Sequence, residues 1–183
     1  MSIILPNKNE PNIETMTGVL AQTYPRAEII IVNDPSGKGK GWATRRGVEA
    51  ASGWPLIFID ADLDIDIYEI VKLLPHLKHY DIVVGKKALP KNLKRRLLTF
   101  LSRFYIRLLF GLKIDTQTGL KIFSYKPTWK TDGWAFDIEI LYRAKKMGKT
   151  MVEIPIEANV SDSKTLKEIW KTLIDSLKIR FSL

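Results

Sequence analysis

The chain has 183 residues, 45% of them hydrophobic, which is enough to bury the core of one ordinary globular domain. It contains no cysteine, which excludes a disulfide framework, a thiolate metal site and a cysteine nucleophile, and this composition suits an intracellular protein. The formal net charge of +9 favours a polyanionic partner: nucleic acid, an anionic membrane surface or a phosphorylated substrate.

Short runs rich in Ile and Val alternate with segments of helical period, a pattern typical of an α/β domain with a mostly parallel sheet covered by helices. We expect strands near 3–5, 28–33, 56–59 and 81–85, and helices near 11–22, 42–51 and 66–77. In open sheets of this kind, ligands bind beyond the carboxyl ends of the strands. The side chains that follow the first three strands should therefore line one crevice: Asn7, Asn33, Asp34, Asp60 and Asp62.

Three acidic residues follow the apolar run 56–59 at intervals of two: Asp60, Asp62 and Asp64. Carboxylate oxygens are preferred ligands of hard divalent cations such as Mg²⁺ and Mn²⁺. Three like charges this close together cost free energy when no cation is near. An ordinary acidic turn is the alternative, but the rigid strand before these residues favours a metal site.

The glycine-rich stretch 35–41 follows the second expected strand and opens a helix, where backbone N–H groups and Lys40 can hold phosphate. It is not a P-loop, because Lys40 is followed by Gly41 and Trp42 instead of Ser or Thr. An exposed turn is the alternative. Two acids, Asp137 and Glu139, open the expected helix 136–147; helix capping is their default role, and a role in the site stays open.

Beyond residue 85 the sequence becomes basic, and two amphipathic helices are expected. The first, 93–112, is dense in Leu and Phe and carries three arginines on one stripe: Arg96, Arg103 and Arg107. It is not a membrane span, because two arginines would lie near the bilayer centre. The second, 165–183, follows Lys164 and has the form of an interfacial membrane anchor. Packing of both helices on the sheet is the alternative.

Six motifs, taken in order, resemble the family 2 GT-A glycosyltransferases, above all the dolichyl- and polyprenyl-phosphate sugar synthases. They lie at 3–10, 28–34, 39–41, 58–63, 115–121 and 134–139. The resemblance implies a Rossmann-like GT-A domain over residues 1–164, with 93–112 as an inserted interface helix. A separate basic amphipathic helix would then occupy 165–183.

The resemblance also implies roles for individual residues. Asp60 and Asp62 would be catalytic and, with Asp64, would bind Mg²⁺ or Mn²⁺. The donor, a nucleoside-diphosphate sugar such as GDP-mannose or UDP-glucose, would contact five residues: Pro6, Asn7, Glu10, Asp34 and Lys40. The phosphate of a polyprenyl acceptor would meet Lys87, Arg96, Arg103, Arg107 and Lys164. Four further candidates lie in the later motifs: Gln117, Lys121, Asp137 and Glu139.

The chain departs from the family pattern at several points. Lys8 stands where the family usually has Tyr, Asn33 where it has the first of two aspartates, and Lys87 where it has Arg. The helix and strand that normally lie between Asp34 and the Gly39 motif are missing. That strand would lie at the edge of the sheet, where its removal leaves the core intact.

The leading hypothesis is an inverting transfer of mannose or glucose to a polyprenyl or dolichyl phosphate. The protein would be cytoplasmic and peripheral on the cytoplasmic face of an anionic membrane, and a membrane-spanning partner protein is left open. Two alternatives remain: a glycosyltransferase with a soluble acceptor, and a non-catalytic, membrane-binding relic of the fold. A nucleic-acid partner is not expected, because the basic residues alternate with aliphatic side chains and not with stacking aromatics.

Overall fold

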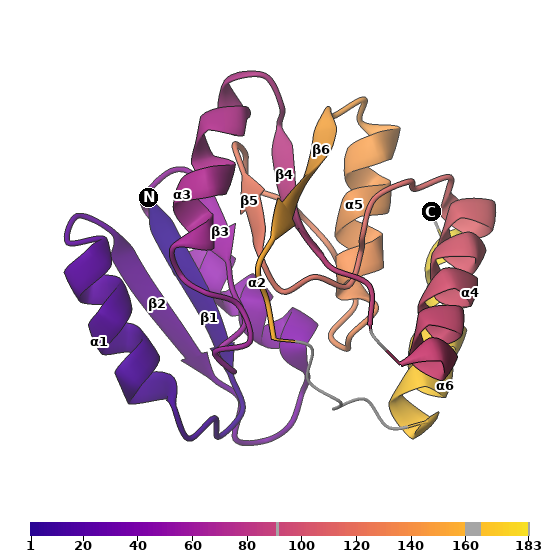
Figure 1. Ribbon diagram of the computed structural model, residues 1–183, viewed down its shortest axis with the longest axis horizontal. Helices are drawn as coiled ribbons and strands as arrows, with labels where there is room; N and C mark the ends of the chain where they lie inside the picture. Colours follow the sequence, from indigo (N-terminus) through magenta and orange to yellow (C-terminus); the bar gives the residue numbers. More distant parts are fainter. Residues whose placement is uncertain (91, 160–165, 183) are drawn as a thin grey trace.

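The computed structural model describes residues 1–90, 92–159 and 166–182 (Figure 1). Six strands form one sheet in the order β2-β1-β3-β5-β4-β6. Their bounds are Ser2–Asn7 (β1), Glu28–Asn33 (β2), Leu56–Phe58 (β3), Ile82–Lys87 (β4), Lys121–Phe123 (β5) and Met151–Ile156 (β6). Only β5 runs antiparallel to its neighbours, β3 and β4. The mostly parallel sheet predicted from the sequence is thus confirmed.

Helices cover both faces of this sheet (Figure 1). Their bounds are Ile13–Thr23 (α1), Lys40–Ala50 (α2), Glu69–Leu73 (α3), Leu93–Phe110 (α4), Phe136–Lys146 (α5) and Leu166–Ser182 (α6), with a 3-10 turn η1 at Leu74–Lys78. Because neighbouring strand residues point to opposite faces, the sheet has two hydrophobic cores. Ile3 and Leu5 share one with α1 and α3, whereas Ile4 and Phe58 share the other with α2 and α5.

The edge strand β2 connects directly to α2 through residues 34–39. The helix–strand unit that the sequence lacks is therefore missing beside an edge, as expected, and the inner strands keep their pairing. Edge position also explains the partial exposure of β2, whose Ile31 side chain is 38% exposed.

The structure differs most from the sequence prediction at three elements. Strands β5 and β6 were not identified, because β5 has only three residues and β6 contains Pro155, a residue tolerated at a sheet edge. The helix expected at 66–77 is instead the short α3 followed by η1, in which Pro75 has no N–H to continue an α-helix.

Helix α4 begins and ends at clear signals. The Asn92 side chain accepts the backbone N–H groups of Lys94 and Arg95 at 3.0 and 3.3 Å. Gly111 then adopts a left-handed φ of +62° and its N–H bonds to Arg107 O at 2.9 Å. The helix therefore ends two residues before the predicted boundary.

Helices α4 and α6 lie side by side, beyond α5 (Figure 1). The Tyr105 hydroxyl lies 3.0 Å from Ser176 Oγ, and Arg180 Nε donates to Leu109 O at 2.9 Å. Ile106 and Phe110 are the buried residues of α4. Within the described part of the chain, no helix combines the length and the apolarity needed to cross a bilayer.

Candidate functional site

The carboxyl ends of β1 and β2 are tied together by amide side chains. Asn7 Nδ2 donates to Asn33 Oδ1 at 2.7 Å, and Asn7 Oδ1 accepts the N–H of Glu10 at 2.9 Å. The N–H of Asp34 in turn donates to Asn7 O at 2.9 Å. The structure therefore brings Asn7, Asn33 and Asp34 together, as the strand-end argument predicted.

Asp34 holds the loop that leads into α2. Its carboxylate accepts the N–H groups of Lys38 at 2.9 Å and of Gly39 at 2.7 Å. Burial alone would raise the pKa of Asp34, but these hydrogen bonds hold that pKa below its ordinary value. Gly39 adopts a φ of +126°, and a Cβ there would overlap the backbone of Asp132. The loop conformation therefore requires both residues.

Lys40, the first residue of α2, forms an ion pair with Asp60 at the end of β3. The side chains are only 14% and 23% exposed, and the ring of Trp134 lies 5.2 Å from Lys40 Nζ. Burial opposes ionisation of Asp60, but the charge of Lys40, with smaller effects from Lys121 and Lys87, lowers the Asp60 pKa. Sequence reasoning placed both residues near the donor but missed their contact, which joins positions twenty residues apart.

The other two acids have different surroundings. Asp62 is exposed, and its Oδ1 accepts the N–H of Asp64 at 3.1 Å. Partial burial and the negative charge of Asp60 raise the Asp62 pKa. Asp64 Oδ2 lies 3.9 Å from the Nζ of Lys87, at the end of β4. The strand-tip cluster, defined as Lys40, Asp60, Asp62, Asp64 and Lys87, thus combines both signs of charge.

The oxygen-rich side chains of Asp62 and Asp64 fit a hard divalent cation, and the like-charge repulsion on Asp62 is what such a cation would relieve. Asp60 is engaged by Lys40. Across residues 1–90, 92–159 and 166–182, no three acidic or histidine side chains are gathered into a preformed metal site. The joint ligand role of the three aspartates therefore stays a prediction.

Three later candidates, Lys121, Asp137 and Glu139, have structural partners. Lys121 is fully buried, and its Nζ lies 2.6 Å from Asp137 Oδ1. Glu139 accepts the N–H of Thr131 at 2.8 Å and the Nε–H of Arg143 at 2.7 Å. Burial would raise the pKa of Glu139, but these bonds lower it. Glu139 thus fixes the loop before α5, beyond the helix-capping role considered first.

The proposed acceptor residues are spread over a wider region. Arg103 donates to Asp115 Oδ2 at 2.7 Å, whereas Arg96 and Arg107 are exposed on α4. Gln117 is exposed in the loop before β5, and its N–H donates to Asp115 Oδ1 at 3.0 Å. Lys164 lies outside the described residues. The structure brings Lys87 to the strand-tip cluster and leaves the acceptor role of the arginines a prediction.

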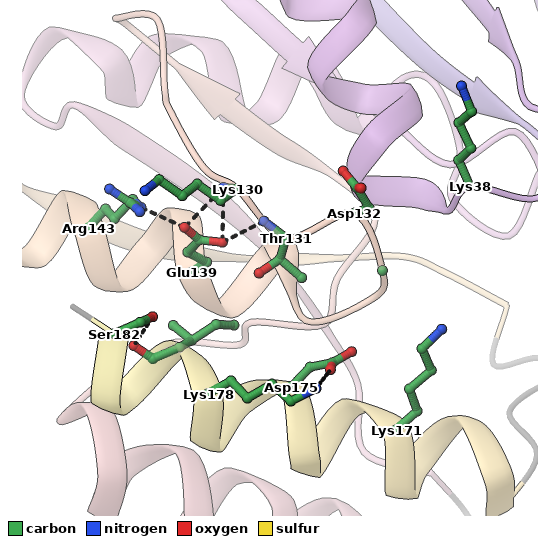
Figure 2. A pocket seen from close by; sticks show the side chains of 12 residues that line it. Lys38, Lys130, Thr131, Asp132, Glu139, Arg143, Lys171, Asp175, Lys178 and Ser182 are labelled. Atoms are coloured by element: carbon green, nitrogen blue, oxygen red, sulfur yellow. Dashed lines mark hydrogen bonds and ion pairs between the residues drawn. The ribbon is translucent and has the colours of Figure 1, made fainter.

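A cavity of about 410 Å³ lies between α6, α5 and the loop before α5 (Figure 2). Figure 2 shows Glu139 holding that loop on one side, while Lys171 and Asp175 of α6 line the other. Lys38, from the loop after β2, also contributes to the lining. The acids of the strand-tip cluster do not line this cavity, so it is a neighbouring feature and not the predicted crevice.

Comparisons with known proteins identify relatives of the chain, although no family model matches it. It is 31% identical over 160 residues to a dolichyl-phosphate beta-glucosyltransferase of Drosophila melanogaster, covering 74% of the chain and 48% of the relative. It is 24% identical to an undecaprenyl-phosphate mannosyltransferase of Micrococcus luteus, covering 88% and 85%. The chain therefore spans about half the length of the Drosophila relative.

Solved structures share the fold. A glucosyl-3-phosphoglycerate synthase from Mycobacterium tuberculosis, in complex with Mn²⁺ and UDP-glucose, superposes with a TM-score of 0.78 at 18% identity, over 98% of this chain and 78% of that one. A mannosyl-3-phosphoglycerate synthase from Rubrobacter xylanophilus gives 0.74 at 16%, over 98% and 72%. The chain therefore has the GT-A fold and is a homologue of dolichyl- and undecaprenyl-phosphate glycosyltransferases, which confirms the family resemblance predicted from the sequence.

Proposed function

We propose that the chain transfers mannose or glucose from a nucleoside-diphosphate sugar to a polyprenyl phosphate, with inversion at the sugar carbon. The observation that carries this proposal is the strand-tip cluster at the carboxyl edge of the sheet, in which Lys40 pairs with Asp60 and Lys87 lies 3.9 Å from Asp64. A diphosphate needs cations and the acids need a counter-charge, so a cluster of both signs suits a donor that arrives with a metal ion. The names of the relatives support this assignment.

The residues of the site divide into donor and acceptor groups. Lys40 and the loop held by Asp34 would bind the donor diphosphate. Asp62 and Asp64 would hold Mg²⁺ or Mn²⁺, which would neutralise charge on the leaving diphosphate. An acceptor phosphate is already anionic at neutral pH and needs no strong base. The remaining task is to orient it, which suits Lys87 and exposed arginines such as Arg96.

The outer face of α4 supports a membrane-bound acceptor. Seven apolar side chains of this helix are each more than half exposed: Leu93, Leu97, Leu98, Phe100, Leu101, Phe104 and Leu108. So many adjacent apolar side chains exceed the scattered apolar exposure of an ordinary protein surface. Basic residues on the same helix would meet anionic headgroups. We therefore place this face on the cytoplasmic surface of an anionic membrane; a membrane-spanning partner stays a prediction.

A transfer assay tests the reaction. The protein is incubated with UDP-glucose or GDP-mannose, Mn²⁺ or Mg²⁺, and a short polyprenyl phosphate, and lipid-linked sugar is measured. We expect transfer from one of the two donors, lost in Asp62→Ala. Absence of both transfer and metal-dependent nucleotide binding would favour the non-catalytic relic.

Vesicle flotation tests the membrane surface separately. Leu97→Asp should abolish flotation with anionic vesicles, because it places a charge in the apolar face of α4. Val71→Asp on α3 is the matched control, since Val71 is 53% exposed and Leu97 58%. Wild-type protein that transfers sugar but does not float would point to a soluble acceptor.

A further inference from the structure

Lys40 occupies the position of a cation in the strand-tip cluster. Its ammonium contacts Asp60 Oδ1 and lies over the Trp134 ring, and Asp137 and Asp62 add negative charge around it. The side chain is only 14% exposed, so water screens these charges weakly. A lysine in this setting supplies the acids with the counter-charge that a metal ion would otherwise provide.

The backbone fixes where this lysine starts. Asp34 binds the N–H of Gly39, and Trp42 N donates to Asp132 O at 3.1 Å, on either side of Lys40. A Cβ on Gly41 would overlap Thr131 O, so this turn also lies tightly against the loop before α5. Lys40 can therefore change partners only by rotating its flexible side chain, while its Cα stays in place.

Asp60 is held from the other side by Gly119. A Cβ on Gly119 would overlap the Asp60 carboxylate, so this carboxylate lies directly on the Gly119 backbone while its other oxygen meets Lys40. The carboxylate therefore has little room for a second cation. A metal ion bound to Asp60 would also repel the nearby Lys40 ammonium. The two cations should compete for Asp60.

We propose that Lys40 is an exchangeable counter-cation, which holds Asp60 until a nucleoside diphosphate arrives, then turns to the diphosphate and releases Asp60 to the metal ion. This exchange rests on the proposed function and adds the order in which the diphosphate and the metal ion bind. Without diphosphate, displacing Lys40 would leave a poorly hydrated ammonium without its ion-pair partner Asp60. Metal ion and nucleotide should therefore strengthen each other's binding, and the metal ion alone should bind weakly.

Electron paramagnetic resonance of Mn²⁺ tests this exchange without relying on activity. Binding of Mn²⁺ is titrated for the wild type and Lys40→Met, each alone and with UDP or GDP. We expect Lys40→Met to bind Mn²⁺ alone roughly tenfold or more tightly than the wild type, because a competing unit charge is gone. Nucleotide should strengthen Mn²⁺ binding more in the wild type than in Lys40→Met.

Two controls make the result specific. Lys38→Met removes the same charge two residues earlier in the chain. Among the residues that the structure describes, the Lys38 ammonium lies 4.7 Å from the centre of the Trp42 ring and forms no ion pair with the three aspartates of the strand-tip cluster, so Mn²⁺ affinity should change less than about twofold. Lys40→Met combined with Asp60→Asn should lose the gain. Thermal melting establishes that each variant is folded, and Lys40→Gln replaces Lys40→Met if the latter does not fold.

The outcomes separate the exchange from the enzymatic function. Equal Mn²⁺ affinity of the wild type and the Lys40 variant overturns the exchange, and the function stands if the wild type still transfers sugar with Mn²⁺. An equal gain in Lys38→Met also overturns it, because general charge would then be the cause. Mn²⁺ that binds to none of these proteins, with or without nucleotide, overturns both proposals.

Discussion

Replacing Lys121 with methionine should destabilise the protein by about 3–5 kcal/mol, the usual cost of removing one partner from a buried ion pair. The side chains of Lys121 and Asp137 are 1% and 9% exposed, and their charged atoms lie 2.6 Å apart. Methionine has nearly the same length and leaves little cavity, so the loss would come from Asp137, which keeps a buried carboxyl without its partner. For a chain of this size the melting temperature should fall by roughly 10 °C.

Urea unfolding followed by circular dichroism measures this loss. The double variant Lys121→Met with Asp137→Asn should recover part of the lost stability, because it also removes the buried charge. A single variant within about 1 kcal/mol of the wild type would refute the reasoning. So would a double variant whose loss equals the sum of the two single losses, since the pair would then not be coupled.

Three further predictions concern the site. Gly119→Ala should lower transfer at least roughly tenfold and stability by about 1–3 kcal/mol, because the added methyl displaces Asp60; unchanged kinetics would contradict this. Asp62→Ala should abolish transfer, and EDTA should reproduce that loss in the wild type. The melting temperature of the variant should stay close to that of the wild type, because Asp62 is exposed. Metal-dependent turnover in the variant would exclude a metal site at Asp62. Glu139→Gln should be less stable than the wild type at pH 7. Because the folded pKa of Glu139 lies below its ordinary 4.5, that difference should shrink as the pH falls below 4.5, and a constant difference between pH 7 and 3 would contradict it.

The alternation of apolar runs and helical segments was enough to predict four of the six strands and most of the helices that cover the sheet. Strand β2 agrees with its predicted bounds, because residues 29–32 form an uninterrupted β-branched run that ends at Asn33. Strand β5 escaped prediction because three residues give no measurable period, and its place depends on pairing with strands far away in the sequence. Helix α3 was overestimated because apolar spacing continues past Pro75, where α-helical hydrogen bonding does not.

The strand-end rule located the acids and Asp34, since it follows from sheet topology alone. It could not foresee how the charges pair. Lys40 meets Asp60, and Lys121 meets Asp137, through contacts set by tertiary packing. Nor does any local pattern show that Trp134 covers Lys40. The glycines were the available signal, because Gly39 and Gly119 mark places where another segment must approach closely.

Because the link between β2 and α2 is short, one side chain, that of Asp34, largely determines its conformation. With no additional helix and strand to shape this corner, the two hydrogen bonds of Asp34 set the loop that presents Lys40. A substitution at Asp34 would therefore also displace Lys40 and leave Asp60 without its ion-pair partner. In this smaller architecture the Asp34 carboxylate fixes one side of the turn that carries Lys40, and the hydrogen bond from Trp42 N to Asp132 O fixes the other.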